Sequence, residues 1–255
     1  MTVSVVIPVK DDDRELARCL SVLSAQTRTA DEIIVVDNGS TDSSAAVAES
    51  HGARVVRCET PGIPAASARG YDSATGDVVL RLDADCVPAD TWVQEMADAF
   101  AARPDVAVFA GGARFIDGPE PLRSPLAALY LGAYVAVLTP TLGHLPLFGS
   151  NLGFRREVWR AVADRVHREN DDMHDDLDLA FHMGEQHRIR YIRAARMGIS
   201  MRPFSSARSF AARIRAGTVT VIAHWPADFP PVRWTRLAMR RLGVGRRPGR
   251  GDAGA

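Results

Sequence analysis

The sequence predicts an α/β protein with a mostly parallel sheet flanked by helices, and three observations lead to this class. Short apolar runs rich in β-branched residues alternate with segments of helical periodicity up to about residue 118. Right-handed crossovers through such helices place successive strands parallel to one another. Polar residues follow several of the runs, at the carboxyl edge of the sheet, where ligands bind in folds of this kind.

The first 118 residues contain five expected strands, each a short apolar run. They are "VSVVIPV" (3–9), "EIIVVD" (32–37), "ARVVRC" (53–58), "DVVLRL" (77–82) and "VAVFAGG" (106–112). Helices are expected between them, over 11–26, 42–50, 63–74 and 90–102. In the first of these helices Leu16, Cys19, Leu20 and Leu23 share one face, and the acids of its first turn suit the helix dipole.

After Gly118 the alternation stops, and further helices are expected over 125–138, from Arg155 onward, over 174–187 and over 206–225. The stretch 124–154 has no formal charge, but it lacks a continuous run of about 20 apolar residues. It is interrupted by Pro140, Gly143 and Pro146. We therefore expect a buried or interfacial segment there rather than a spanning helix. The Gly/Arg-rich tail from Arg246 is expected to be disordered.

The formal net charge of zero hides an uneven distribution of charge along the chain. Residues 1–150 carry 11 basic and 20 acidic side chains, whereas residues 151–255 carry 20 basic and 11 acidic ones. The basic part suits a phosphate-rich ligand, an anionic membrane or nucleic acid, or simply a set of solvated faces. Because no nucleic-acid-binding motif occurs, we expect no nucleic-acid partner.

Three cysteines, Cys19, Cys58 and Cys86, lack the paired spacing of a zinc site or a disulfide framework, as expected in a reducing compartment. The start "MTVSVVIPVK" reads as a strand and not as a signal peptide. These two observations predict a cytoplasmic protein.

Asp83 and Asp85, in "RLDADC", follow an apolar strand directly. Unpaired carboxylates are costly to bury, so a cation is expected between them, and paired oxygen ligands suit Mg²⁺ or Mn²⁺. The alternative is a capping cluster for the next helix, and the short motif alone does not decide between the two.

Two further acidic positions are candidates for chemistry. Asp37 ends a strand and can accept hydrogen bonds from a base or a ribose, or it can form an Asx turn with the "NGS" that follows. Asp175, Asp176 and Asp178 crowd the start of a helix, where one of them can serve as a general base. A solvated helix start is the alternative, and His174 is interpreted as a bystander.

Taken in order, these motifs resemble the glycosyltransferases of family 2, which have the GT-A fold and use nucleotide sugars. The matching stretches cover about residues 3–187. They are "VSVVIPVKDDDRELARCLSVLSAQT", "DEIIVVDNGSTDSS", "GIPAASARGYDSATGDVVLRLDADC", "PLFGSNLGFRREVWRAV" and "HDDLDLAFHM".

The resemblance implies a role for each group of residues. Pro8, Val9 and Asp37 would line the nucleoside pocket, Asp83 with its neighbour Ala84 would contact the ribose or the metal, and Asp85 would bind Mn²⁺ or Mg²⁺. Asp176, paired with Asp175, would be the catalytic base. Gly149, Ser150 and Asn151 would lie near the acceptor. The third metal ligand is unassigned, and His224 is a candidate.

The chain departs from the family pattern at two places. Relatives usually read A-R-N-x-G where this chain has "ASARG", so Ser67 stands in the arginine slot and Arg69, the candidate donor-binding arginine, is displaced by about 200° on a helix. The Q-x-x-R-W motif of processive members is absent, because Pro230 precedes "PVRW". A polymer-extruding synthase is therefore disfavoured.

The function implied by the resemblance is inverting transfer of one sugar to a hydroxyl acceptor, as in glycan or cell-envelope biosynthesis. The donor would be UDP-, GDP- or dTDP-linked, and the acceptor a glycan, a small molecule or a lipid-linked compound. Inversion follows from one base and no enzyme nucleophile. A degenerate nucleotide-sugar-binding module and a nucleotidyltransferase are the alternatives, although the latter usually has a glycine-rich, basic loop where "PVKDDDREL" is acidic.

Three segments follow from this assignment. Residues 1–118 form the nucleotide-sugar half, residues 119–225 the acceptor and base half of the same domain, and residues 226–255 a basic helix and tail. "VRWTRLAMRRLG" (232–243) mixes apolar residues with arginines, a composition typical of an interfacial helix. We therefore expect contact with an anionic membrane on its cytoplasmic face. The residues that carry this expectation are Trp234, Leu237, Leu242, Arg233, Arg236, Arg240 and Arg241.

Overall fold

A mixed sheet of eight strands, in the order β3-β2-β1-β4-β7-β6-β8-β5, forms the centre of the computed structural model, which describes residues 1–204 and 206–242. Four parallel strands make up one side of it. They are β1 (Val3–Val9), β2 (Glu32–Asp37), β3 (Arg54–Arg57) and β4 (Val78–Arg81). Val5 of β1 pairs with Ile33 of β2 and Leu80 of β4, so these three parallel strands end at the same edge of the sheet.

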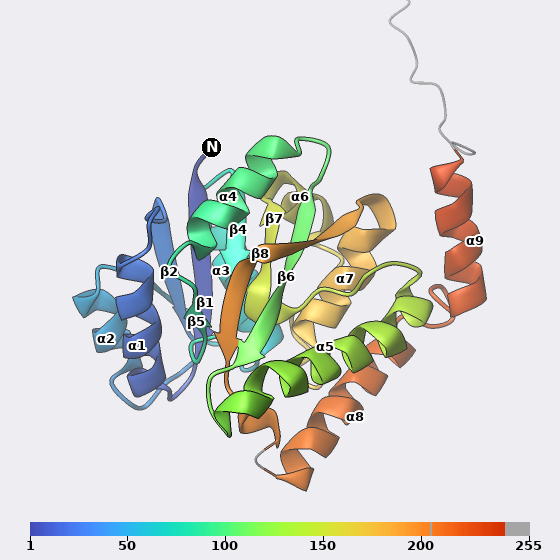
Figure 1. Ribbon diagram of the computed structural model, residues 1–255. Coiled ribbons are helices and arrows are strands. Elements are labelled where there is room, and N and C mark those ends of the chain that lie inside the picture. Colours follow the sequence, from blue (N-terminus) through green and yellow to red (C-terminus); the bar gives the residue numbers. More distant parts are fainter. Residues whose placement is uncertain (205, 243–255) are drawn as a thin grey trace, which may run out of the picture.

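Helices cover both faces of this sheet (Figure 1). The helices of the first half are α1 (Asp13–Ser24), α2 (Ser44–Ser50), α3 (Ile63–Ser73) and α4 (Trp92–Ala102). Val5 and Ile7 pack with α1 and α4, whereas Val6 packs with α3, as the period of two in a strand requires. Two apolar cores therefore lie on opposite faces of the sheet.

Small residues let α3 lie close to the sheet. A Cβ on Gly70 would come within 2.3 Å of Val6 Cγ1 and 2.9 Å of Val36 Cγ2. Larger residues in this turn of the helix would push α3 away from β1 and β2, and with it the side chains that α3 directs toward the carboxyl edge.

Four further strands complete the same sheet, and the sequence predicted only β6 among them. They are β5 (Val87–Pro88), β6 (Val108–Phe115), β7 (Leu152–Arg155) and β8 (Ile189–Ile199). β7 runs antiparallel between β4 and β6, and β8 runs parallel to β6. Segments 1–118 and 119–225 thus share one sheet; their exact boundaries remain a prediction.

The remaining described elements contact both faces of this sheet, since α6 and α7 pack in the core of α3 and α5 packs partly in the opposite core. They are α5 (Glu120–Leu142), the 3₁₀ turn η1 (Gly149–Asn151), α6 (Arg156–Val162), α7 (Asp175–Gln186), the 3₁₀ turn η2 (Arg202–Phe204), α8 (Ala207–Ala223) and α9 (Pro230–Arg241). The expected disordered tail from Arg246 lies outside the described residues.

The expectation that Pro140 breaks the apolar stretch after Ser124 is wrong. α5 continues through Pro125 and Pro140 and ends at Gly143, which adopts a left-handed conformation. Of the two expectations for this segment, burial does not hold, because only Ala127 and Leu142 of α5 are buried, and an interfacial position remains a prediction. Within the described residues, α5 is the one helix whose length and composition would allow it to cross a membrane.

The C-terminal helix α9 is held to the protein by its own basic and apolar residues. Arg233 is fully buried and donates hydrogen bonds to the carbonyls of Leu142 and Phe181 and to the carboxylate of Asp228. Leu237 is buried as well. These two side chains, expected to face a membrane, therefore anchor α9 instead, and Trp234 and Leu242 remain exposed.

Candidate active site

Acidic side chains from distant parts of the sequence meet around one buried arginine at the carboxyl edge of the sheet. Arg81, the last residue of β4, is 3% exposed. Its Nη2 lies 2.9 Å from Oδ1 of Asp83 and 3.3 Å from Oδ2 of Asp175. A Cβ at position 149 would lie 1.8 Å from Nη1 of Arg81, so only glycine leaves room there for the guanidinium.

The predicted acceptor-side turn η1 is joined to both acidic groups. The backbone N–H of Gly149 donates to Oδ2 of Asp176 at 2.8 Å, and Ser150 Oγ donates to Oδ2 of Asp83 at 2.5 Å. The structure thus brings together Asp83, Asp175, Asp176, Gly149 and Ser150, and the roles expected of them remain a prediction.

Asp175 and Asp176 occupy different electrostatic environments. Burial and the charge of Asp176 raise the pKa of Asp175, against the opposing effects of Arg81 and of Ser67, whose Oγ donates to Oδ2 at 2.8 Å. Burial also disfavours ionised Asp176, but His174, Arg81 and the Gly149 N–H together leave the pKa of that carboxyl lowered.

His174 is a partner of Asp176 and not a bystander. Its Nδ1 lies 3.4 Å from Oδ1 of Asp176. Burial disfavours the imidazolium, yet the hydrogen bond and charge of Asp176 raise the pKa of His174. Apart from this long contact with His174, the buried Oδ1 of Asp176 has no hydrogen-bond partner among the described residues.

Asp85 lies beside an arginine that the sequence analysis did not single out. Nη2 of Arg202, from η2, lies 2.8 Å from Oδ2 of Asp85 and 2.5 Å from Oδ2 of Asp12. Burial and the charge of Asp83 raise the pKa of Asp85, and Arg202 opposes this shift. The Asp83–Asp85 pair is therefore a place that favours a cation.

The donor set at this pair suits a hard divalent cation. Ligand atoms of Asp83, Asp85 and Cys86 lie within 4.8 Å of one another. Burial raises the pKa of Cys86 well above its usual range, so its thiol stays protonated and is a poor ligand. The two carboxylates are oxygen ligands, which Mg²⁺ and Mn²⁺ prefer.

The remaining donor-side candidates lie along the same edge. Pro8 and Val9 end β1 and pair with Val36 and Asp37. Asp37 is 8% exposed, and its Oδ1 accepts the Ser40 N–H, three residues on, at 2.9 Å, so the carboxylate holds the turn that follows β2. Because β2 lies two strands from β4, Asp37 is about 10 Å along the edge from the acids after β4. Ala84 is buried between Asp83 and Asp85.

Three candidates are not brought to these acids. Arg69 is exposed on α3. The side chain of Asn151 is fully buried, donates to the carbonyls of Gly112 and Ala195, and accepts from Trp92, so it holds β6, β8 and α4 together. His224 lies beside Asp178 and not beside Asp85.

Arg81 is the residue that sequence reasoning missed, although a signal was present. It is the one charged side chain in the run "VVLR", and a charge at the end of a buried strand requires a partner. Asp83, two residues later in "RLDADC", supplies one partner, and Asp175 of α7 supplies the other.

Comparison with known sequences gives one family. Residues 4–162 match the model of Glycosyl transferase family 2. The chain is 31% identical over 100 residues to glycosyltransferase AglE of Haloferax volcanii, a match that covers 36% of this chain and 33% of that protein. It is 35% identical over 114 residues to undecaprenyl-phosphate 4-deoxy-4-formamido-L-arabinose transferase of Sodalis glossinidius, which covers 41% of this chain and 35% of that protein. The matches span about a third of the length of these relatives.

Comparison with solved structures agrees with the sheet and helices described above. Glucosyl-3-phosphoglycerate synthase from Mycobacterium tuberculosis, solved with Mn²⁺, UDP and phosphoglyceric acid, aligns with a TM-score of 0.64 at 20% identity. The alignment covers 87% of this chain and 78% of that chain. It confirms the α/β fold of the GT-A type that the sequence predicted.

Proposed function

Because the chain belongs to glycosyl transferase family 2, we propose that it transfers one sugar from a nucleoside diphosphate donor to a hydroxyl acceptor. The observation that carries this proposal is the buried Oδ1 of Asp176, which among the described residues has only the long 3.4 Å contact with Nδ1 of His174. A buried carboxylate oxygen without a donor is costly, and an acceptor hydroxyl would supply the missing donor.

The proposed donor site runs along the carboxyl edge from β2 to β4. Pro8, Val9 and Asp37 would border the nucleoside, and Asp83 would face the ribose and the diphosphate. The structural relative from Mycobacterium tuberculosis was solved with UDP, so UDP-linked sugars are the first donors to test; GDP- and dTDP-linked sugars come next.

The proposed divalent cation, Mn²⁺ or Mg²⁺, would be held by Asp85 and Asp83. When bound there, it would supply positive charge for the departing diphosphate. The pairing of Asp85 with Arg202 supports a cation at this position. In the absence of donor, the guanidinium of Arg202 neutralises Asp85 and Asp12.

Asp176 is the proposed base. The Gly149 N–H fixes its Oδ2 at 2.8 Å and leaves Oδ1 to take the proton of the acceptor hydroxyl. Because the pKa of Asp176 is lowered, the carboxylate is ionised at neutral pH, although the same shift makes it a weaker base. A single base without an enzyme nucleophile gives one displacement, so the anomeric configuration would invert.

Asp175 and Arg81 are proposed to position this base. Arg81 balances the charges of Asp175 and Asp83, and Ser67 fixes the same carboxylate of Asp175. Asp175 therefore stays in the first turn of α7 without repelling Asp176 from the site.

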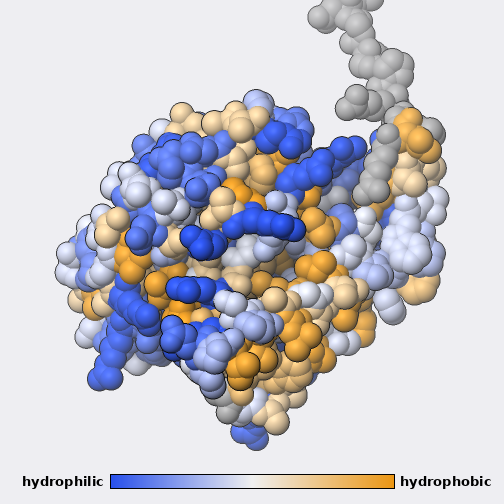
Figure 2. Space-filling view, viewed as in Figure 1, coloured by the Kyte–Doolittle hydropathy of each residue, from blue (hydrophilic) through white to orange (hydrophobic). Residues whose placement is uncertain are grey.

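A lipid-linked acceptor at an anionic membrane surface is proposed because of the exposed apolar side of α5 and α8. Leu129 and Val137 of α5 are 71% and 68% exposed, and Ile214 of α8 is 58% exposed. Tyr130 of α5 packs on Phe204 of η2, which precedes α8, with ring centroids 5.1 Å apart. Figure 2 shows largely apolar side chains over α5. We also propose that the protein is cytoplasmic and contacts the cytoplasmic face of the membrane.

The test is transfer or donor hydrolysis with a panel of nucleotide sugars and Mn²⁺. We expect Asp176→Asn to lower kcat by about 10²–10⁴-fold, as loss of a general base does, with UDP binding retained. Asp164→Asn, an exposed acid nearby, is the matched control and should keep full activity. Binding of nucleotide sugars without any turnover would instead favour the degenerate binding module, and no binding at all would contradict the proposed function.

A further inference from the structure

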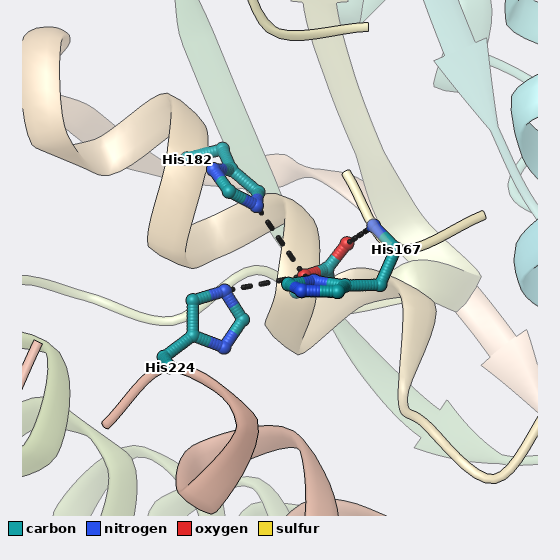
Figure 3. A group of neighbouring side chains, drawn as sticks. His167, His182 and His224 are labelled. Atoms are coloured by element: carbon teal, nitrogen blue, oxygen red, sulfur yellow. Dashed lines mark hydrogen bonds and ion pairs between the residues drawn. The ribbon is translucent and has the colours of Figure 1, made fainter. Parts of the chain in front are cut away.

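Three histidines and one aspartate converge at a second place on α7. His167 follows α6, Asp178 and His182 lie one turn apart on α7, and His224 caps the end of α8. One ligand atom from each of the four lies within 4.8 Å of the other three. Figure 3 shows the rings of His167, His182 and His224 directed toward a common centre.

This cluster is separate from the candidate active site. Positions 176 and 178 of a helix are about 200° apart, so Asp178 faces away from the side on which Asp176 meets Gly149. The cluster joins the segment after α6, the helix α7 and the end of α8. Each of these parts contributes at least one of the four residues.

Hydrogen bonding within the cluster does not satisfy its buried nitrogens. Oδ1 of Asp178 faces Nδ1 of His167 at 2.7 Å, Nε2 of His224 at 3.2 Å and Nε2 of His182 at 3.4 Å. Its other oxygen already accepts the backbone N–H of His167 at 2.9 Å. Among the described residues, Nε2 of His182 and of His224 have no hydrogen-bond partner, although both atoms are buried.

The tautomer of His224 explains why its Nε2 has no hydrogen-bond partner. Its Nδ1 lies 2.8 Å from the carbonyl oxygen of Thr220, which can only accept, so Nδ1 carries the proton. A ring in the neutral form then directs the lone pair of Nε2 at the carboxylate of Asp178, whereas a charged ring would donate its Nε2–H to that oxygen. A lone pair facing an anionic oxygen is repulsive, and a metal cation bound by both atoms would make the contact favourable. Donation of the other ring N–H to a carbonyl is usual for histidines that bind metals.

The spacing of the four groups suits a tetrahedral ion. Zinc bound at about 2.0–2.1 Å separates neighbouring ligand atoms by about 3.3–3.4 Å. The contacts of Asp178 with His224 (3.2 Å) and His182 (3.4 Å) are close to this length, and the contact with His167 (2.7 Å) would have to lengthen by about 0.6 Å when the ion binds. The ring of His224 is held in place by stacking on Phe181, with centroids 4.0 Å apart.

We propose that His167, Asp178, His182 and His224 form a tetrahedral site for Zn²⁺, distinct from the Mn²⁺ or Mg²⁺ pair at Asp83 and Asp85. Three imidazole nitrogens and one carboxylate suit Zn²⁺, whereas Mg²⁺ and Mn²⁺ prefer oxygen ligands. Four protein ligands complete the coordination, so the ion is structural. It would tie α7, which carries Asp175 and Asp176, to α8. The side chain of His167 is 40% exposed and gives the ion access.

The test uses the untagged full chain after chelator treatment and dialysis, titrated with Co²⁺ and then with Zn²⁺. We expect one equivalent of Co²⁺ with the intense visible absorption of a tetrahedral ion, displaced by Zn²⁺. Saturation with Zn²⁺ should also raise Tm by about 5 °C. Absence of the tetrahedral absorption in the wild-type chain would overturn the proposal.

Variants locate the site without an activity assay. His224→Gln and His167→Gln should each weaken Co²⁺ binding at least tenfold, and His167→Gln is the better-tolerated change because His167 is partly exposed. His51→Gln, at the exposed end of α2, is the matched control and should bind normally. Asp85→Asn should bind Co²⁺ normally as well, and loss of the tetrahedral absorption in that variant would place the ion at the proposed active site and refute the second site.

Discussion

Nη2 of Arg81 lies 3.3 Å from Oδ2 of Asp175, and Oγ of Ser67 donates to that same oxygen. The A-R-N-x-G pattern of relatives has an arginine at the position of Ser67. In this chain the cation beside Asp175 comes from β4, and Ser67 of α3 supplies a hydroxyl to the same carboxylate.

Replacing Arg81 by leucine should destabilise the protein and its site together. The change leaves Asp83 and Asp175 without their shared buried partner, and breaking a buried pair in this way costs about 3–5 kcal/mol. Urea unfolding measures the loss, and Arg81→Lys, which keeps the charge, should lose less. An Arg81→Leu variant as stable as the wild type would show that the ion pair contributes nothing.

A double variant tests whether an arginine on α3 can replace the arginine of β4. Ser67→Arg in the Arg81→Leu background restores a guanidinium next to Asp175, so we expect stability and sugar transfer to recover at least tenfold over Arg81→Leu alone. Ser67→Lys in the same background tests charge without the planar fork of arginine. If neither double variant recovers, the two positions are not interchangeable.

The fold of the first half could be predicted because its strands are buried on both faces. β1, β2 and β4 are largely apolar runs, and the acids that end β2 and follow β4 indicated the site. β8 could not be found in this way, since "IRYIRAARMGI" exposes its arginines on a solvated face and hides the apolar alternation. β7 has four residues and runs antiparallel, against the rhythm of the preceding strands.

The site, like the fold, was only partly predictable from the sequence. Asp83, Asp85 and Asp176 could be chosen from local motifs, but the pairing of Arg81 with Asp175 depends on how α7 packs against β4. The exposure of α5 was equally unreadable, because an apolar helix has the same composition whether protein or another medium covers it.

Arg202 should compete with a metal ion for Asp85. Its guanidinium contacts Asp85 and Asp12, so Mn²⁺ can bind Asp85 only if the arginine leaves. We expect Arg202→Gln to bind Mn²⁺ about three- to tenfold more tightly in the absence of nucleotide, because the displaced pair is partly exposed. Calorimetric titration measures the affinity.

The control for this experiment is Arg103→Gln, which removes an exposed arginine paired with Asp105 away from the site. It should leave Mn²⁺ affinity unchanged. Weaker Mn²⁺ binding in Arg202→Gln would mean that the arginine supports the metal and does not compete with it.

Glu32 should make the stability of the sheet depend on pH. Although burial opposes its ionisation, hydrogen bonds from Ser4, Thr75 and Arg54 lower its pKa to about 2. Because the folded pKa is depressed, the contribution is present above pH 4.5 and is lost as the pH falls through 4.5 toward 2. A shift of this size is about 3 kcal/mol for a fully buried group, and solvent screening reduces the expected contribution to about 1 kcal/mol.

Denaturant unfolding of wild type and Glu32→Gln at pH 7 and at pH 3 measures this contribution. The variant should be less stable at pH 7, and the difference should shrink at pH 3. Glu49→Gln, an exposed acid on α2, should show no such change. Equal pH dependence of Glu32→Gln and wild type would contradict the prediction.

The proposed membrane surface predicts salt-sensitive binding of the full chain to vesicles. Arg208 and Arg213 are exposed on α8 beside the apolar side chains of α5, and each basic residue at an anionic surface contributes about 1 kcal/mol. Leu129→Glu with Val137→Glu adds two negative charges to this surface and should lower flotation with phosphatidylserine vesicles more than tenfold. The matched control is Ile63→Glu with Tyr191→Glu, which makes the same change at residues 57% and 52% exposed elsewhere. Equal loss in both pairs would assign the effect to net charge and contradict a defined surface, and flotation that is absent in the wild type would remove the membrane from the proposal.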